Sequence, residues 1–166
     1  MTGKTDFSDA DWAKILSAPL LAGVAVTMAE PSGLFGMLKE GMASGSALLA
    51  ARTDAAAGPL ARAVADDFES GDARARARDA LQAEIGGKKP AELRDAAVAA
   101  LESVGELVDA KAPQEAPAFK AWLRSLAEKV AESASEGGFL GFGGVKVTEA
   151  EKATVAEVGR ALKIPA

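Results

Sequence analysis

The chain has 166 residues, a net charge of −5, neither cysteine nor histidine, and an aromatic content of only 5%. This length corresponds to one ordinary domain, and the alanine-rich composition favours helices packed through small side chains. The acidic balance argues against binding of nucleic acid, which needs basic residues at the phosphates. The missing residue types exclude disulfides, thiolate metal sites and histidine chemistry.

A helix start is predicted near the N-terminus. Ser8 is suited to be the N-cap, and Asp11 follows at the third helical position. Phe7 precedes the cap and can pack on Trp12 as a hydrophobic staple. These residues predict where the first helix begins.

The next stretch, residues 15–29, reads ILSAPLLAGVAVTMA and contains no charged residue. A helix that is apolar on every face has to be buried, and this run is shorter than the ~20 residues of a membrane span. We therefore expect it to form the centre of the core. Pro19 fits the first turn of a helix, so the run is predicted to be a bent or broken pair of helices.

Further helices are predicted from apolar residues at helical spacing. They cover about 34–52, 59–68, 72–85, 90–110, 118–135 and 149–162. Glycines at 36, 41 and 45 predict a close helix crossing or a break in the first of these. Thr148 and Glu151 form the capping box of the last.

The predicted fold is one all-α domain over residues 1–166, with residues 1–6 flexible and seven or eight helices around the apolar central helix. Trp122, Phe139 and Phe142 are expected to complete the core. No convincing strand is predicted beyond residues 145–147.

Two loops resemble each other. Residues 29–36 read AEPSGLFG and residues 135–141 read SEGGFLG. Each contains a glutamate, a turn of small residues, an apolar pair and a glycine, which leaves an internal duplication open.

The second loop and the helix after it are similar to the loop-to-helix pattern of the tellurite-resistance TerB family, in which an acidic turn and a short extended piece precede a Ser/Thr-x-x-Glu box. The family's Asp-Gly turn is replaced here by Glu-Pro-Ser-Gly and Glu-Gly-Gly. The resemblance implies an all-helical, metal- or stress-responsive domain. Its candidate metal ligands are Glu30, Glu40, Glu136, Glu149 and Glu151.

Carboxylates without histidine or cysteine suit only hard cations such as Ca²⁺ or Mg²⁺. The alternative is that Glu149 and Glu151 complement the positive end of a helix dipole.

The glycine-rich segment EGGFLGFGGVKV is the second candidate site. Its candidate ligand-binding residues are Gly138, Phe139, Gly141, Phe142, Gly143 and Lys146. Successive backbone N–H groups near a helix start can hold an anion, although the segment matches neither common phosphate-binding motif. The alternatives are that its phenylalanines fill the core or form an apolar flap over a pocket.

These features predict a non-enzymatic binding or interaction module with an unknown ligand and no nucleic-acid partner. A protein partner is left open. The N-terminus lacks the apolar region of a signal peptide, so a cytoplasmic location is expected. The alternatives are a carboxylate-dependent enzyme and a protein that binds lipid or a membrane surface. The oligomeric state stays open, with a homodimer among the possibilities.

Overall fold

The computed structural model describes residues 3–29, 45–46, 48–135 and 147–165, without the side chains of residues 134 and 135. Every regular element in these ranges is helical, which confirms the predicted all-α fold. The buried hydrophobic side chains form one cluster. Within the same ranges no helix has the length and apolar character needed to cross a membrane.

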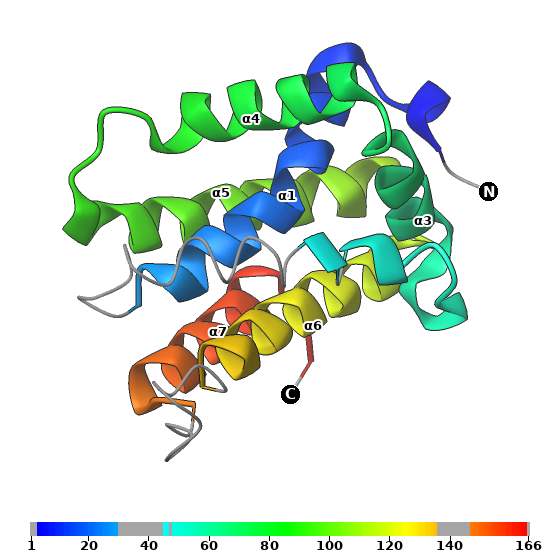
Figure 1. Ribbon diagram of the computed structural model, residues 1–166. Coiled ribbons are helices and arrows are strands. Elements are labelled where there is room, and N and C mark those ends of the chain that lie inside the picture. The colour runs from blue at the N-terminus through cyan, green and yellow to red at the C-terminus, as the bar shows by residue number, and fades with distance from the viewer. Residues whose placement is uncertain (1–2, 30–44, 47, 136–146, 166) are drawn as a thin grey trace.

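Figure 1 shows the arrangement of the helices. The 3₁₀-helices are η1 (Lys4–Asp6) and η2 (Ala55–Ala57), and the α-helices are α1 (Asp9–Thr27), α3 (Gly58–Asp67), α4 (Gly71–Ile85), α5 (Pro90–Lys111), α6 (Ala116–Ser135) and α7 (Glu149–Ala161). Residues 45–46 and 48–50 are also helical, whereas 51–52, the predicted end of the helix over 34–52, form a turn. Residues 34–44 and 47 of that predicted helix lie outside the described residues.

Helix α1 forms the centre of the core, as its uncharged sequence predicts. It packs against α4, α5, α6 and α7 (Figure 1). The predicted break at Pro19 is wrong, because α1 runs without interruption from Asp9 to Thr27. A proline inside a helix costs about 3 kcal/mol, whereas full burial of one leucine or isoleucine contributes roughly 1.5–3 kcal/mol. Ile15, Leu16 and Leu21 around the proline are all 0% exposed, so tertiary packing outweighs the local preference.

The predicted start of α1 is confirmed. The backbone N–H of Asp11 donates to Ser8 Oγ at 3.1 Å. The rings of Phe7 and Trp12 lie 5.9 Å apart, which is the hydrophobic staple. Local side-chain chemistry therefore fixes where this helix begins.

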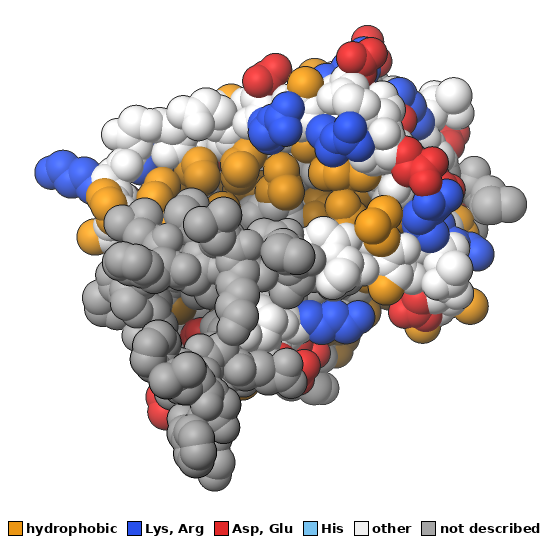
Figure 2. Space-filling model, in the orientation of Figure 1, with side chains coloured by type: hydrophobic (Ala, Val, Ile, Leu, Met, Phe, Trp, Pro, Cys, Tyr) orange, Lys and Arg blue, Asp and Glu red, His pale blue; other side chains and the backbone are white. Residues whose placement is uncertain are grey.

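Small residues let the helices pack closely, as the composition predicts. The buried residues of α4 are Ala73 and Ala77 alone, and this helix contacts α1 and, less extensively, α5. Figure 2 shows a band of hydrophobic side chains beside α4. Half-buried hydrophobic residues are Leu20 and Val24 in α1 and Leu81 and Ile85 in α4.

Helix α6 packs against α1 and α7, and η2 and α3 contact it from another side. Its predicted apolar face is buried: Phe119, Trp122, Leu123, Leu126 and Val130 are at most 7% exposed. Trp122 thus belongs to the core, as expected. Phe139 and Phe142, which were predicted to join it there, lie outside the described residues.

Helix α7 begins at the predicted capping box. Glu151 N donates to Thr148 Oγ1 at 3.1 Å, and Thr148 N donates to Glu151 Oε2 at 2.8 Å. At the other end, Lys163 N donates to Arg160 O, and Ile164 N donates to Gly159 O. This pair of bonds is a Schellman motif with lysine at the position that usually holds glycine.

Candidate functional site

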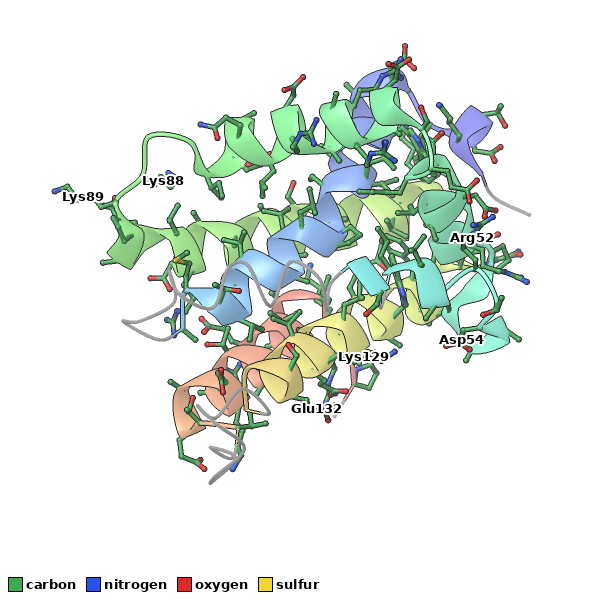
Figure 3. All side chains as sticks on the ribbon, viewed as in Figure 1. Arg52, Asp54, Lys88, Lys89, Lys129 and Glu132 are labelled. Carbon is green, nitrogen blue, oxygen red and sulfur yellow. The ribbon has the colours of Figure 1, made fainter. Side chains whose placement is uncertain are left out.

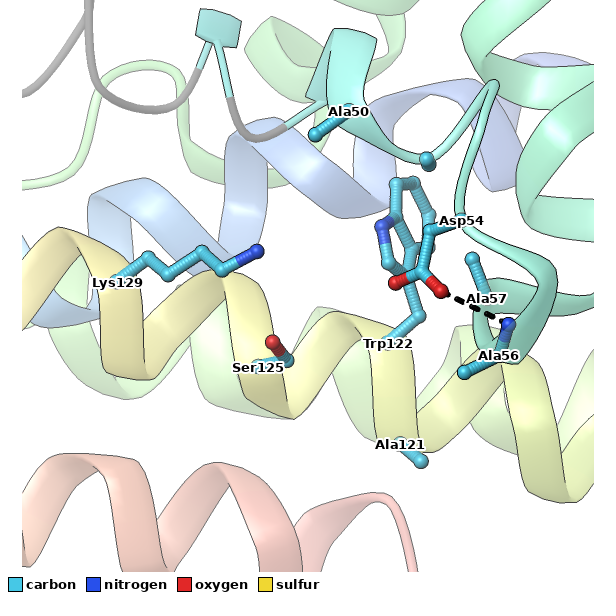
Figure 4. A pocket seen from close by; sticks show the side chains of 9 residues that line it. Ala50, Asp54, Ala56, Ala57, Ala121, Trp122, Ser125 and Lys129 are labelled. Carbon is cyan, nitrogen blue, oxygen red and sulfur yellow. Dashed lines mark hydrogen bonds between the residues drawn. The ribbon is translucent and has the colours of Figure 1, made fainter.

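A cavity of about 160 Å³ lies between α6 and the turn that contains η2 (Figure 4). Five alanines form much of its wall, and Trp122 lies beside them. Its polar groups come from Asp54, Ser125 and Lys129. The cavity therefore combines an apolar lining with three side chains that bear hydrogen-bonding groups.

The α6 side of the cavity follows from helical spacing. Ser125 and Lys129 come three and seven positions after Trp122, so the three side chains share one face of the helix. Trp122 is 7% exposed and its ring centroid is 5.5 Å from that of Phe119. This aromatic contact helps to fix the indole at the cavity wall.

The opposite side is built by the turn before α3. Asp54 is the N-cap of η2, and one of its carboxylate oxygens, Oδ1, accepts a hydrogen bond of 2.8 Å from Ala56 N. Gly58 follows with φ of 81° and ψ of 168°, a conformation essentially restricted to glycine. The turn thus holds the Asp54 carboxylate at the cavity (Figure 4).

The two charged groups at the cavity approach it from different elements. In Figure 4, the Lys129 side chain extends along α6 toward the cavity, and the Asp54 carboxylate enters from the η2 turn. Neither residue forms an ion pair with any other residue, and Asp54 Oδ2 accepts no hydrogen bond, within the described ranges. Both residues are exposed, and neither charge has a partner among the described residues.

Arg52, Lys88 and Lys89 do not pair with Asp54. Arg52 instead pairs with Asp66 and Glu69. The hydrogen bond that Arg52 donates to Asp66, followed by the charge of Glu69, raises the pKa of Arg52. Lys88 and Lys89 lie at the far end of the molecule, in the turn between α4 and α5 (Figure 3).

A second cavity, of about 260 Å³, lies between α6 and α7. Its apolar residues are Ala131, Val147, Val155 and Ala156, and its charged residues are Arg124, Glu128, Glu132 and Lys152. Arg124 pairs with Glu128 at 3.1 Å, and Lys152 pairs with Glu149 at 2.8 Å. Its cationic groups are therefore already satisfied, in contrast to Lys129.

The structure places two of the five predicted metal ligands. Glu149 is 89% exposed and pairs with Lys152, whereas Glu151 is 6% exposed and caps α7. Glu30, Glu40 and Glu136 lie outside the described residues. In the part of the chain that is described, no three acidic side chains gather as a metal site would require. Binding of Ca²⁺ or Mg²⁺ by the five glutamates stays a prediction.

The predicted glycine-rich ligand site lies outside the described residues. Gly138, Phe139, Gly141, Phe142, Gly143 and Lys146 all lie within 136–146. Its role as an anion cradle, core plug or flap therefore stays a prediction, as does the duplication with residues 29–36.

Sequence reasoning placed Trp122 in the core but missed the cavity beside it. The spacing of Trp122, Ser125 and Lys129 on one helical face was a readable signal. Asp54 had no such signal, because its approach to α6 depends on how distant helices pack. The cavity could therefore be recognised only in the three-dimensional structure.

Comparison of the chain with protein-family models, curated proteins and solved structures found no match. The resemblance to the TerB family therefore stays a prediction.

Proposed function

We propose that the protein is a cytoplasmic, non-enzymatic binding module that holds a small ligand in the cavity beside Trp122. The observation that carries this proposal is the combination, at one cavity, of a buried indole with two oppositely charged side chains, Asp54 and Lys129, that have no ion-pair partner among the described residues. Ligand sites typically combine apolar and aromatic walls with a few placed polar groups.

The cavity volume limits the size of the ligand. An engineered protein cavity of about 150 Å³ holds benzene, whereas pockets for drug-sized molecules have about 300–1,000 Å³. At about 160 Å³, the cavity beside Trp122 suits a molecule or a terminal group of roughly benzene size. A nucleotide or a flavin would not fit inside it.

The polar groups support binding rather than nucleophilic catalysis. An activated serine needs a base within hydrogen-bond reach. Ser125 Oγ makes no hydrogen bond to Lys129 or Asp54. Asp54 is in turn tied by Oδ1 to the backbone of its own turn, an arrangement that positions a fixed acceptor.

The test is a heteronuclear NMR screen with charged and neutral molecules of benzene size or smaller. We expect at least one member to shift the amide signals of residues that line the cavity, in a saturable manner. Ser125→Leu should abolish the shifts because the larger side chain occupies the cavity. Ser125→Ala, which leaves the cavity open, should retain them.

The proposal would be overturned if every molecule left these amide signals unchanged. It would also be overturned if Ser125→Leu, with a native spectrum elsewhere, responded as the unaltered protein does. Thermal melts of both variants establish that the comparison is made between folded proteins.

A further inference from the structure

The two charged side chains at the cavity have opposite signs but do not neutralise each other. Asp54 belongs to the η2 turn and Lys129 to α6, and no ion pair joins them. Figure 3 shows the two residues on different elements of the fold. A ligand that lies between them can therefore meet a negative group at one end and a positive group at the other.

The two charged side chains also differ in whether they donate or accept hydrogen bonds. An ionised aspartate only accepts hydrogen bonds, and a lysine ammonium only donates them. Oδ1 of Asp54 already accepts a hydrogen bond from Ala56 N, whereas Oδ2 accepts none among the described residues. Ser125 on the Lys129 side offers a hydroxyl that donates as well as accepts.

The walls fit a short hydrocarbon spacer. Alanine methyl groups and the Trp122 indole line the same cavity as the two charged groups. An indole also attracts an ammonium group. The positive end of a ligand is thus favoured near Asp54 and Trp122.

We infer that this cavity binds a small zwitterion, such as a short amino acid, with its ammonium at Asp54 and its carboxylate at Lys129 and Ser125. The inference rests on the proposed function and names its ligand class. A ligand with one charge leaves the opposite protein charge unpaired beside it. The same pair of charges therefore disfavours simple cations and simple anions, which gives selectivity.

The test is calorimetric titration of the full chain with glycine, β-alanine and γ-aminobutyrate as zwitterions. Butyrate and n-butylamine carry the same charges singly and are the matched comparison. We expect at least one zwitterion to bind on the order of tenfold more tightly than either singly charged compound, because it gains a second charge-assisted hydrogen bond.

Two variants test which charged end of the zwitterion binds to which protein residue. Asp54→Asn keeps the side-chain shape, Lys129→Gln keeps the number of side-chain heavy atoms on a shorter chain, and each removes one charge. Each should weaken zwitterion binding on the order of tenfold. Asp54→Asn should also spare butyrate binding, and Lys129→Gln should spare butylamine binding.

The outcomes separate this inference from the proposed function. If neutral or singly charged molecules bind the cavity as tightly as every zwitterion, the ligand class is wrong while the cavity remains a binding site. If zwitterions bind but Ser125→Leu has no effect, the assigned site is wrong. If no probe binds and the NMR screen is also silent, both proposals fall.

Discussion

The indole Nε1 of Trp12 donates a hydrogen bond of 2.8 Å to Asp67 Oδ2, which joins the first turn of α1 to the last residue of α3. Lys4 Nζ approaches the same oxygen at 3.2 Å. Trp12 is 1% exposed, so Asp67 supplies its indole N–H with a partner in a nearly water-free position. This contact holds α3, and with it the η2 turn that carries Asp54, against the core.

Removal of this acceptor should destabilise the protein. We expect Asp67→Ala to lower the free energy of unfolding by about 1–3 kcal/mol, because a buried donor loses its hydrogen bond. Urea denaturation gives this change directly. Asp67→Asn keeps an acceptor oxygen and should lose distinctly less. Equal losses in the two variants would show that the hydrogen bond is not the cause.

Sequence reasoning succeeded here where the chemistry is local. Ser8 and Thr148 were recognised as caps because the bonds they form lie within four residues of the cap. It failed at Pro19, since the burial of the surrounding side chains outweighs a local preference against proline. It also missed the cavity, because Asp54 meets the Trp122 face only after α6 and η2 have packed together.

Two glycines should respond in opposite ways to alanine. Gly58 has φ of 81°, and a Cβ there would lie 3.0 Å from Ala118 Cβ. Gly58→Ala should therefore lower the free energy of unfolding by about 1–3 kcal/mol. Gly105 is helical, and its added Cβ would meet Leu162 Cδ2 at 3.4 Å, an ordinary contact. Gly105→Ala should raise the free energy of unfolding by up to about 1 kcal/mol.

Thermal melts followed by circular dichroism measure both effects. For a domain of this size, each 1 kcal/mol corresponds to roughly 2–4 °C in Tm. A rise in Tm for Gly58→Ala would contradict the backbone conformation assigned to the η2 to α3 turn.

Lys163 ends α7 with a positive φ of 54°, which is unfavourable for a residue with a side chain. Its Nζ pairs with Glu106 Oε1 at 2.9 Å on the surface. An ion pair on the surface contributes little to stability, whereas the left-handed backbone conformation costs roughly 1–2 kcal/mol. Lys163→Gly should therefore be neutral or should stabilise the protein by up to about 1 kcal/mol.

Glu106→Gln measures the ion pair separately, because it leaves the backbone of Lys163 unchanged. The hydrogen bond and charge of Glu106 raise the pKa of Lys163. A raised lysine pKa means that the stabilisation is complete at neutral pH and disappears as the pH rises through the folded-state pKa. The free energy of unfolding should therefore change less between neutral and strongly alkaline pH in Glu106→Gln than in the unaltered protein. A clear loss of stability in Lys163→Gly would contradict this account.

The capping box of α7 gives a further prediction. Thr148→Ala should lower the free energy of unfolding by about 1 kcal/mol, because the N–H of Glu151 loses its acceptor. Glu151→Gln should lose less than Glu151→Ala, since its amide oxygen can still accept from Thr148 N. Thermal melts of the metal-free protein measure these differences.

The metal prediction is tested with Glu149→Gln and Glu151→Gln. Capping alone predicts that melts in EDTA, Ca²⁺ and Mg²⁺ coincide. A cation at about 100 times its Kd would instead add about 2.7 kcal/mol. A stabilisation of this kind that disappears in Glu149→Gln and Glu151→Gln would support the metal-responsive role implied by the TerB resemblance.

Tryptophan fluorescence reports directly on a ligand in the cavity, because only Trp122 of the two tryptophans borders it, while Trp12 is 1% exposed and lies in the core. We would titrate the protein with γ-aminobutyrate and with neutral butyramide. We expect a saturable spectral change with at least one of them, lost in Trp122→Phe and in Ser125→Leu and retained in Ser125→Ala. An unchanged spectrum with both compounds, or a change that persists in Trp122→Phe, would contradict it.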